Sequence, residues 1–182
     1  MLASPASRVT HAQPEAGDAF SYHVFGREDG LLEDEVSELF QDSLGFIWMA
    51  TRQGLIRFDG YTFRAFDPTV GDTTGLQWRQ LCCLHPHHDG ERLWTAGGNR
   101  LSLFDPVSET FTHHHFVSDH PDGIPDAIAG LHPDPHDPDL IWLGHTRGFG
   151  LTGVGRLDVR DDAYADFSLS LIHISEPTRL CR

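Results

Sequence analysis

A unit centred on a tryptophan occurs three times in this chain and constrains its fold more than any other feature. The tryptophans, Trp48, Trp94 and Trp142, lie 46 and then 48 residues apart. Each stands in a short apolar run that ends in small or turn-forming residues. A repeat of roughly 40 to 50 residues indicates units that stack side by side and bury a shared core. We therefore expect the tryptophans to pack between units rather than to bind a ligand.

Two further markers keep the same register in every unit. A glycine followed by an aliphatic residue lies 18 or 19 residues before each tryptophan, and an aspartate that follows an apolar residue lies 11 or 16 residues after it. We interpret these residues, with the tryptophans, as structural repeat positions. The glycines are Gly30, Gly75 and Gly123, and the aspartates are Asp59, Asp105 and Asp158.

Each unit divides into four short apolar runs separated by turn residues, which is the pattern of a four-stranded antiparallel meander. In the first unit the runs cover residues 36–41, 46–51, 54–58 and 62–66. No comparable stretch carries an apolar stripe of helical period. Four strands per repeat are typical of a β-propeller blade. The sequence therefore predicts an all-β fold, a partial β-propeller of three four-stranded antiparallel blades.

Residues 30–60 of the first unit resemble the two-component regulator propeller repeat. They share its Gly-Leu start, a valine six residues later, an acidic turn with glycine, a strand containing tryptophan, and then Gly-Leu and an aromatic-Asp pair. Ala50 and Ala96 stand where that repeat has glycine, whereas Gly144 keeps it. The resemblance extends over residues 20–167, with weaker matches in the later units and an insertion in the third.

This resemblance implies part of an extracytoplasmic sensor in a membrane-bound signal-transduction protein. The output module of such proteins is a histidine kinase or a diguanylate cyclase. The implied location is the periplasmic side of an inner-membrane protein, and the implied ligand is a small molecule or a carbohydrate. A homodimer is expected for the full-length protein, and no catalytic residue or cofactor is expected in these blades.

The expected organisation is three blades preceded by a lone strand. The blades cover residues 30–74, 75–122 and 123–168. Because propellers close with roughly four to eight blades, we expect a fragment of a ring, with seven blades as the expected total. Residues 20–29 are expected to be the closing outer strand of a last blade outside this chain, and the remaining blades are expected partners. Residues 1–19 lack a signal-peptide core, so they are predicted to be a disordered leader or a signal-peptide remnant.

The C-terminal end of the chain does not follow the repeat. Residues 169–179 resemble the translation of a sequencing-library adapter. We therefore expect 169–182 to be a non-native tail that takes no part in the fold. The alternative is a natural outer strand over residues 168–174.

Charge and hydropathy exclude several classes of partner. The chain has 27 acidic and 13 basic residues, a net charge of −14. Nucleic acids and anionic membranes attract basic surfaces, so neither is an expected direct partner. No segment has the roughly 20 apolar residues of a membrane span.

Adjacent cysteines, Cys82 and Cys83, fall in the expected inner strand of the second blade. Neighbouring strand residues point to opposite faces, so we expect two separate thiols. A strained vicinal disulfide is the alternative.

Histidines gather in equivalent turns of the second and third units. They are His85, His87, His88, His132 and His136. Imidazoles and carboxylates of neighbouring loops are able to bind a divalent metal ion, which makes these histidines the candidates for a metal site. Their spacing matches no known zinc pattern, however, and proline-rich polar turns are ordinary in solvent-facing loops, so no metal is expected.

Trp78 and Arg79 lie off the repeat positions, at the entry to the inner strand of the second blade. Loops at this place surround the mouth of a propeller, where an indole stacks on a ligand and a guanidinium pairs with its polar groups. These two residues are the candidates for ligand binding, and burial of Trp78 against a neighbouring blade is the alternative.

A propeller enzyme is the rival interpretation of the chain. Residues 42–48 resemble the Asp-box turn of sialidases, with one extra residue between aspartate and glycine. The sequence contains no nucleophile elbow, phosphate loop or HExxH motif. A lyase-like or glycosidase-like enzyme would thus have its active site in blades outside this chain.

Overall fold

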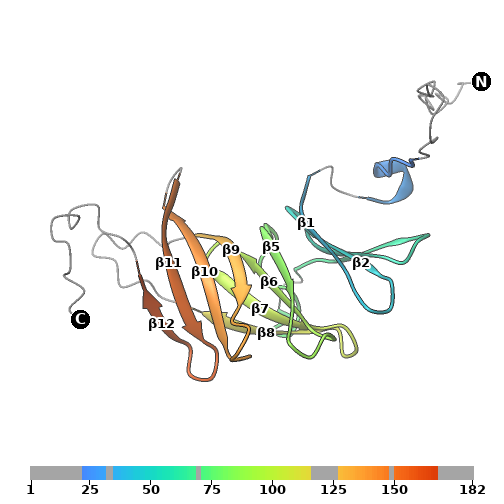
Figure 1. Cartoon of the computed structure of the whole chain (residues 1–182). Helices are drawn as coiled ribbons and strands as arrows, with labels where there is room; N and C mark the ends of the chain where they lie inside the picture. The colour runs from blue at the N-terminus through green and yellow to red at the C-terminus, as the bar shows by residue number, and fades with distance from the viewer. Residues whose placement is uncertain (1–21, 32–34, 69–70, 116–126, 148–149, 168–182) are drawn as a thin grey trace, which may run out of the picture.

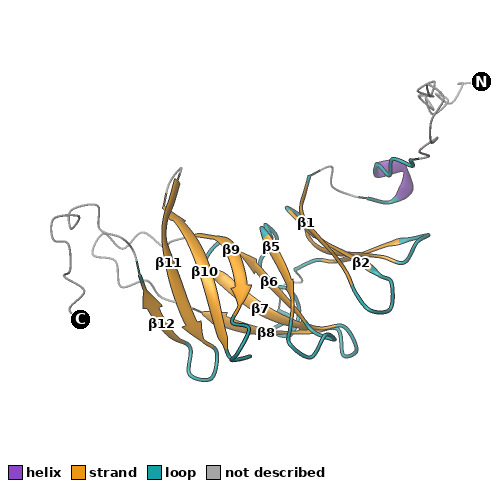
Figure 2. Ribbon diagram, viewed as in Figure 1, coloured by secondary structure: helices purple, strands orange, loops and turns teal. Residues whose placement is uncertain are grey.

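Three antiparallel sheets make up the structured part of this chain. The computed structural model describes residues 22–31, 35–68, 71–115, 127–147 and 150–167. Each sheet has four strands in sequential order, and the sheets lie side by side with the second between the other two (Figures 1 and 2). The predicted all-β fold, a partial propeller of three blades, is confirmed, whereas the total of seven blades stays a prediction.

The strands of the first sheet, blade 1, are β1 (Val36–Gln41), β2 (Ile47–Thr51), β3 (Gly54–Phe58) and β4 (Phe63–Phe66). Those of blade 2 are β5 (Cys83–Pro86), β6 (Leu93–Gly97), β7 (Arg100–Asp105) and β8 (Thr110–His115). Those of blade 3 are β9 (Ala127–Pro133), β10 (Leu140–Arg147), β11 (Gly150–Asp158) and β12 (Ala163–Asp166). The first strands of neighbouring blades contact one another, as inner strands do around a propeller axis.

The repeated tryptophans occupy the same place in each sheet. Trp48 lies opposite Phe40 on one side and Arg57 on the other. Trp94 and Trp142 lie opposite the equivalent residues of the first and third strands of their own blades. The insertion in the third unit lengthens β10 and β11, whose register shifts between His145 and Thr146, and so explains the wider spacing there.

Most of the core lies between blades rather than within them. One cluster joins Trp48, Ala50 and Leu55 of blade 1 to leucines and phenylalanines of blade 2. A second cluster joins blade 2 to blade 3 and includes Trp94 and Ala96. Trp48 and Trp94 are each 1% exposed, which confirms their predicted packing between blades, whereas Trp142 is half-buried and belongs to neither cluster. Burial of a tryptophan side chain contributes several kcal/mol.

The repeated aspartates hold the outer turns. Asp59 accepts the backbone N–H groups of Tyr61 and Thr62, at 2.8 and 2.7 Å, and Asp105 makes similar bonds in blade 2. These bonds hold the pKa of both carboxyl groups below its usual range. An aspartate at the end of every third strand therefore fixes the hairpin to the fourth strand.

The outer turns also connect the blades. Glu109, just before β8, has a left-handed backbone (φ 57°) and forms an ion pair with Arg64 of blade 1. Asp162, just before β12, has the same conformation (φ 55°), and its carboxylate lies 2.8 Å from His114 Nδ1 of blade 2. Each of these turns thus contacts the outer strand of the preceding blade.

The N-terminal segment differs from the expected closing strand. Residues 22–26 form no strand, and Arg27–Asp29 form a short 3-10 helix, η1, that ends at Gly30 in the left-handed region (φ 97°). The phenyl ring of Phe25 packs on Phe58 and Phe63 of blade 1. A lone strand has no ladder partner without the blade that it closes, so the closing role of residues 20–29 stays a prediction.

Several predictions fall outside the described residues. These concern the leader 1–19, the tail 169–182 and the repeat glycine Gly123.

Candidate functional site

The two ends of the blades carry different side chains. At one end, which we call the hairpin end, lie the β1–β2 and β3–β4 turns and their equivalents, rich in aspartate and histidine. At the other, the linker end, lie the β2–β3 turns and the loops that join one blade to the next. The predicted ligand residues lie at the linker end and the predicted metal ligands lie at or near the hairpin end.

Trp78 lies in the exposed loop that joins blade 1 to blade 2. Its side chain is 40% exposed, and its indole rests against Gly98 in the β6–β7 turn of its own blade. A Cβ at Gly98 would lie 3.1 Å from indole Cε2, and Gly98 has a positive φ of 57°. Glycine at this position thus lets the indole lie flat on the turn, so Trp78 is not buried against a neighbouring blade.

Polar residues lie on both sides of Trp78 in this loop. Arg100 Nη1 donates to Gln77 Oε1 at 3.1 Å, which links the loop to the start of β7. Arg79 is exposed, and no side-chain hydrogen bond or ion pair joins it to another described residue. The Trp78 patch, as we call it, combines an exposed indole with two arginine residues. It consists of Gln77, Trp78, Arg79 and Arg100.

The predicted metal-ligating histidines make separate contacts. The rings of His85 and His132, at equivalent positions of β5 and β9, lie edge to face with centroids 5.4 Å apart. His88 Nε2 lies 2.7 Å from the carbonyl oxygen of Asp134, and His87 Nδ1 lies 3.0 Å from Asp89 Oδ2. His136 is exposed in the β9–β10 turn. No group of three or more metal-ligating side chains is brought together within the described ranges.

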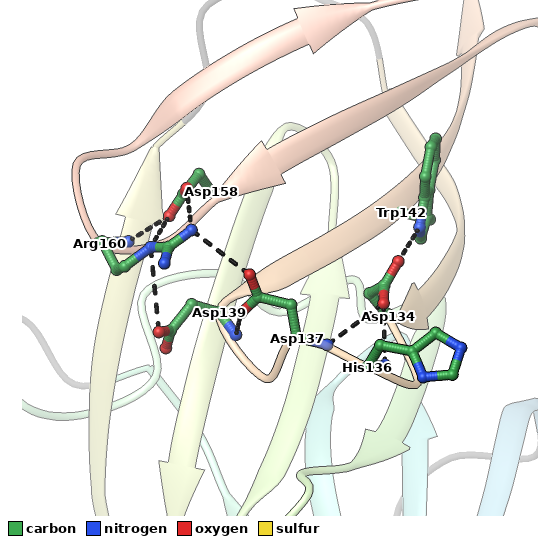
Figure 3. A network of polar contacts seen from close by, with 7 residues as sticks. All are labelled: Asp134, His136, Asp137, Asp139, Trp142, Asp158 and Arg160. Carbon is green, nitrogen blue, oxygen red and sulfur yellow. Dashed lines mark hydrogen bonds and ion pairs between the residues drawn. The ribbon is translucent and has the colours of Figure 1, made fainter.

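An aspartate holds the indole of two of the repeated tryptophans. Asp42 Oδ2 accepts the indole N–H of Trp48 at 2.8 Å, while its Oδ1 accepts the backbone N–H groups of Leu44 and Phe46. In blade 3, Asp134 Oδ2 accepts the indole N–H of Trp142 at 2.9 Å (Figure 3). This bond is the main reason why the pKa of Asp134 lies below its usual range. Both bonds are structural, and sequence analysis did not identify them.

Blade 2 has a histidine at this place. The backbone N–H of His87 donates to Arg92 O at 2.8 Å, as Asp42 donates to Phe46 O and Asp134 to Leu140 O. The indole N–H of Trp94 is buried and has no hydrogen-bond partner among the described residues. The rings of His87 and His114 lie 5.8 and 5.7 Å from the Trp94 ring.

Arg160 gathers three carboxylates at the hairpin end of blade 3 (Figure 3). Its Nη2 lies 2.5 Å from Asp158 Oδ2 and 3.5 Å from Asp137 Oδ2, and its Nε lies 3.9 Å from Asp139 Oδ2. The guanidinium group lowers the pKa of Asp158 to about 2. This repeat aspartate therefore stays charged at neutral pH, paired with an exposed arginine.

A contact between Ser102 and His113 bears on the enzyme interpretation. Ser102 Oγ lies 2.8 Å from His113 Nδ1, and His113 Nε2 lies 3.0 Å from the carbonyl oxygen of Gly75. A serine nucleophile needs a histidine that is free to take its proton. Both ring nitrogens of His113 have contacts that join β7 and β8 to the start of the blade, so this contact is structural.

The comparisons with known proteins agree with the propeller geometry. The chain is 37% identical over 57 residues to histidine kinase P4 of Formosa agariphila, a match that covers 31% of this chain and 4% of that protein. No family model matches the chain.

Two solved structures share the fold. One is the extracellular domain of a B. thetaiotaomicron protein described as the hybrid two-component system BT3049 (TM-score 0.65, 19% identity), matched over 82% of this chain and 20% of that one. The other is the extracellular domain of a protein from the same organism described as the hybrid two-component system BT4673 (TM-score 0.51, 21% identity), matched over 76% of this chain and 16% of that one. The predicted resemblance to sensors of two-component systems is confirmed, and the chain spans a fifth of the first of these domains. Within the described part of the chain no helix has the length and apolar character of a membrane span.

Proposed function

We propose that this chain forms blades of an extracytoplasmic ligand-sensing propeller in a membrane-bound signal-transduction protein. The output of the whole protein would be a histidine kinase or a diguanylate cyclase. The proposed location is the periplasmic face of the inner membrane. Ligand binding to the propeller would shift the equilibrium between two arrangements of the full-length homodimer.

The observation that carries the proposal is the similarity of this chain to a histidine kinase, in a region that folds as propeller blades. The match in fold to extracellular domains of two-component proteins supports the same assignment. The net charge of −14 supports the proposal, because nucleic acids and anionic membranes attract basic surfaces.

We propose the Trp78 patch as the part of the ligand site that this chain supplies. The exposed indole of Trp78 rests on Gly98, so its position is fixed before a ligand arrives. An aromatic face and a nearby guanidinium suit a small polar ligand such as a carbohydrate, whose C–H groups stack on the indole and whose oxygens accept from Arg79.

The reading frame of the source DNA tests the proposed function. A membrane-spanning segment followed by a kinase or cyclase domain, downstream of further blades, is the expected result. A stop after six or seven blades whose loops bring histidines and glutamates together would instead favour the propeller enzyme.

Binding measurements on the complete sensor region test the ligand site. A panel of mono- and oligosaccharides is screened by calorimetry, and the ligand found is measured with Trp78→Ala and Arg79→Ala. Each variant is expected to weaken binding at least tenfold. Tyr61→Ala is the matched control, because Tyr61 is an exposed aromatic residue at the hairpin end. Equal weakening by the control would place the ligand elsewhere.

A further inference from the structure

The thiols of Cys82 and Cys83 lie together at the boundary between blades 2 and 3. Their sulfur atoms are 2.7 Å apart. Both cysteines are free thiols, as predicted, but their side chains do not point to opposite faces, because β5 begins at Cys83 and Cys82 lies just outside the strand. Strict alternation therefore does not apply to this pair.

The surroundings of the two thiols differ. Cys83 is 4% exposed and belongs to the cluster between blades 2 and 3. Cys82 is half-buried, and its thiol lies 3.1 Å from the carbonyl oxygen of Ile128 in blade 3 and 3.4 Å from that of Ala96. The thiol of Cys82 thus contacts blade 3 from its place at the edge of blade 2.

The acidities of the two thiols also differ. The hydrogen bond between the sulfurs lowers the pKa of the Cys82 thiol, and together with burial it raises the pKa of the Cys83 thiol. Cys82 is the more exposed of the two. Because the thiolate is the nucleophile in thiol chemistry, its lower pKa and greater exposure make Cys82 the better placed of the two sulfurs to attack first.

We propose that Cys82 and Cys83 form a dithiol site that reacts with small-molecule disulfides to give a reversible vicinal disulfide. The Cys82 thiolate attacks one sulfur of the oxidant, whose S–S bond breaks and releases a thiolate that takes up a proton. Cys83 then loses its proton to solvent and attacks the Cys82 sulfur, which releases the second thiol. The protein pair loses two electrons and two protons, and the oxidant disulfide is reduced to two thiols.

The geometry of adjacent residues makes such a bond reducible. Consecutive Cα atoms lie about 3.8 Å apart, whereas disulfides usually span about 4.4 to 6.8 Å between Cα atoms. A strained disulfide is a labile one. Oxidation also removes the S–H group of Cys82, which then no longer donates to Ile128 O. The state of the dithiol thus affects a contact between two blades.

The first test uses the full chain with Cys181→Ser, which removes the thiol of the C-terminal tail. After treatment with oxidised glutathione, intact mass spectrometry is expected to show the loss of two hydrogen atoms with no added glutathione, reversed by dithiothreitol. Cys82→Ser in the same background is expected to gain glutathione or stay reduced. Stable glutathione adducts on the chain that retains both cysteines, or no reaction, would overturn the proposal.

A second test needs no oxidant and depends on both sulfurs. Phenylarsine oxide forms two As–S bonds with a dithiol and releases water. One arsenical is expected per chain that retains Cys82 and Cys83, with loss of this binding in Cys82→Ser, a substitution at the half-buried position. Equal binding by Cys82→Ser would contradict the dithiol site. The identity of the oxidant in the cell rests on the proposed extracytoplasmic location, but neither test depends on it, so the two proposals fail separately.

Discussion

The first hairpins of blades 1 and 2 share a backbone and differ at one side chain. The backbone N–H groups of Asp42 and His87 make the same hydrogen bond across the hairpin. In each blade the carbonyl that accepts it belongs to the residue two positions before the tryptophan. The carboxylate of Asp42 also accepts the indole N–H of Trp48, whereas Trp94 has no such acceptor among the described residues. The repeat therefore fixes the backbone of the hairpin in every blade. It does not fix whether the indole N–H of the tryptophan has a hydrogen-bond acceptor.

The difference has an energetic consequence. A buried donor without a partner costs about 1 to 3 kcal/mol. Blade 2 tolerates this cost because Trp94 still fills the space between blades 2 and 3. Packing between blades is thus what Trp48 and Trp94 share, and the indole hydrogen bond is an addition made in blades 1 and 3.

The largest expected effect is that of Asp42→Ala in blade 1. The substitution leaves the indole N–H of Trp48 and two backbone N–H groups without their acceptor, so the free energy of unfolding is expected to fall by about 2 kcal/mol. Urea denaturation followed by tryptophan fluorescence measures it. Asp42→Asn, which keeps an acceptor oxygen, is the control and is expected to lose less. Equal losses would contradict a stabilising role for an acceptor oxygen at position 42.

Replacing each tryptophan by phenylalanine compares the two indoles directly. Trp48→Phe removes a hydrogen bond to a carboxylate as well as volume, whereas Trp94→Phe removes volume and an unsatisfied donor. We expect Trp48→Phe to cost about 1 kcal/mol more than Trp94→Phe, measured in the same denaturation experiment. A larger loss for Trp94→Phe would show that this indole has an acceptor.

His87→Asn would supply blade 2 with an acceptor for the indole N–H of Trp94. Asparagine supports the same kind of turn and offers an oxygen to the indole N–H of Trp94, so we expect a gain of about 1 kcal/mol in the free energy of unfolding. Asp89 keeps its hydrogen bonds from Arg92 when His87 is replaced. His136→Asn, at an exposed ring, is the control and is expected to change little. The prediction is wrong if both variants behave alike.

The smallest expected effect is an acid dependence of blade 3. The pKa of Asp158 is about 2 because Arg160 hydrogen-bonds its charged form. A carboxyl group whose folded pKa is depressed stabilises the fold above its unfolded pKa of about 4, and this contribution is lost as pH falls towards 2. Melting temperature is measured between pH 6 and pH 2. Arg160→Gln is expected to show a slightly smaller decrease in melting temperature, because the pKa of Asp158 in the folded variant lies closer to its unfolded value. A profile identical to that of the unsubstituted chain would contradict the pairing.

The architecture was predictable because turn-forming residues separate the apolar runs that form the strands. In blade 1 every predicted run agrees with a strand to within one residue, since turn residues such as Asp59 and Gly60 end each apolar run. The burial of Trp48 and Trp94 and the small residues beside them followed from the same repeat. These features depend on local sequence, which a single chain shows directly.

The contacts of the candidate site were less predictable. Asp42 precedes its tryptophan by six residues and Asp134 by eight, so hairpins of different length hide their equivalence until the backbone hydrogen bonds align them. A strand boundary one residue later than expected brought the two cysteine sulfurs together. Trp78 rests on a turn of its own blade because Gly98 makes room for the indole, which depends on the fold rather than on spacing.

The ion pairs of the outer turns are arranged in the same way between blades 1 and 2 and between blades 2 and 3. Glu109 of blade 2 contacts blade 1, and Asp162 of blade 3 contacts blade 2, so each tether belongs to the later blade of a pair. Removing blade 3 would release His114 but leave every tether between blades 1 and 2 in place. In both pairs the later blade supplies the carboxylate and the earlier blade supplies the basic side chain, so the two outer strands of a neighbouring pair of blades are not interchangeable.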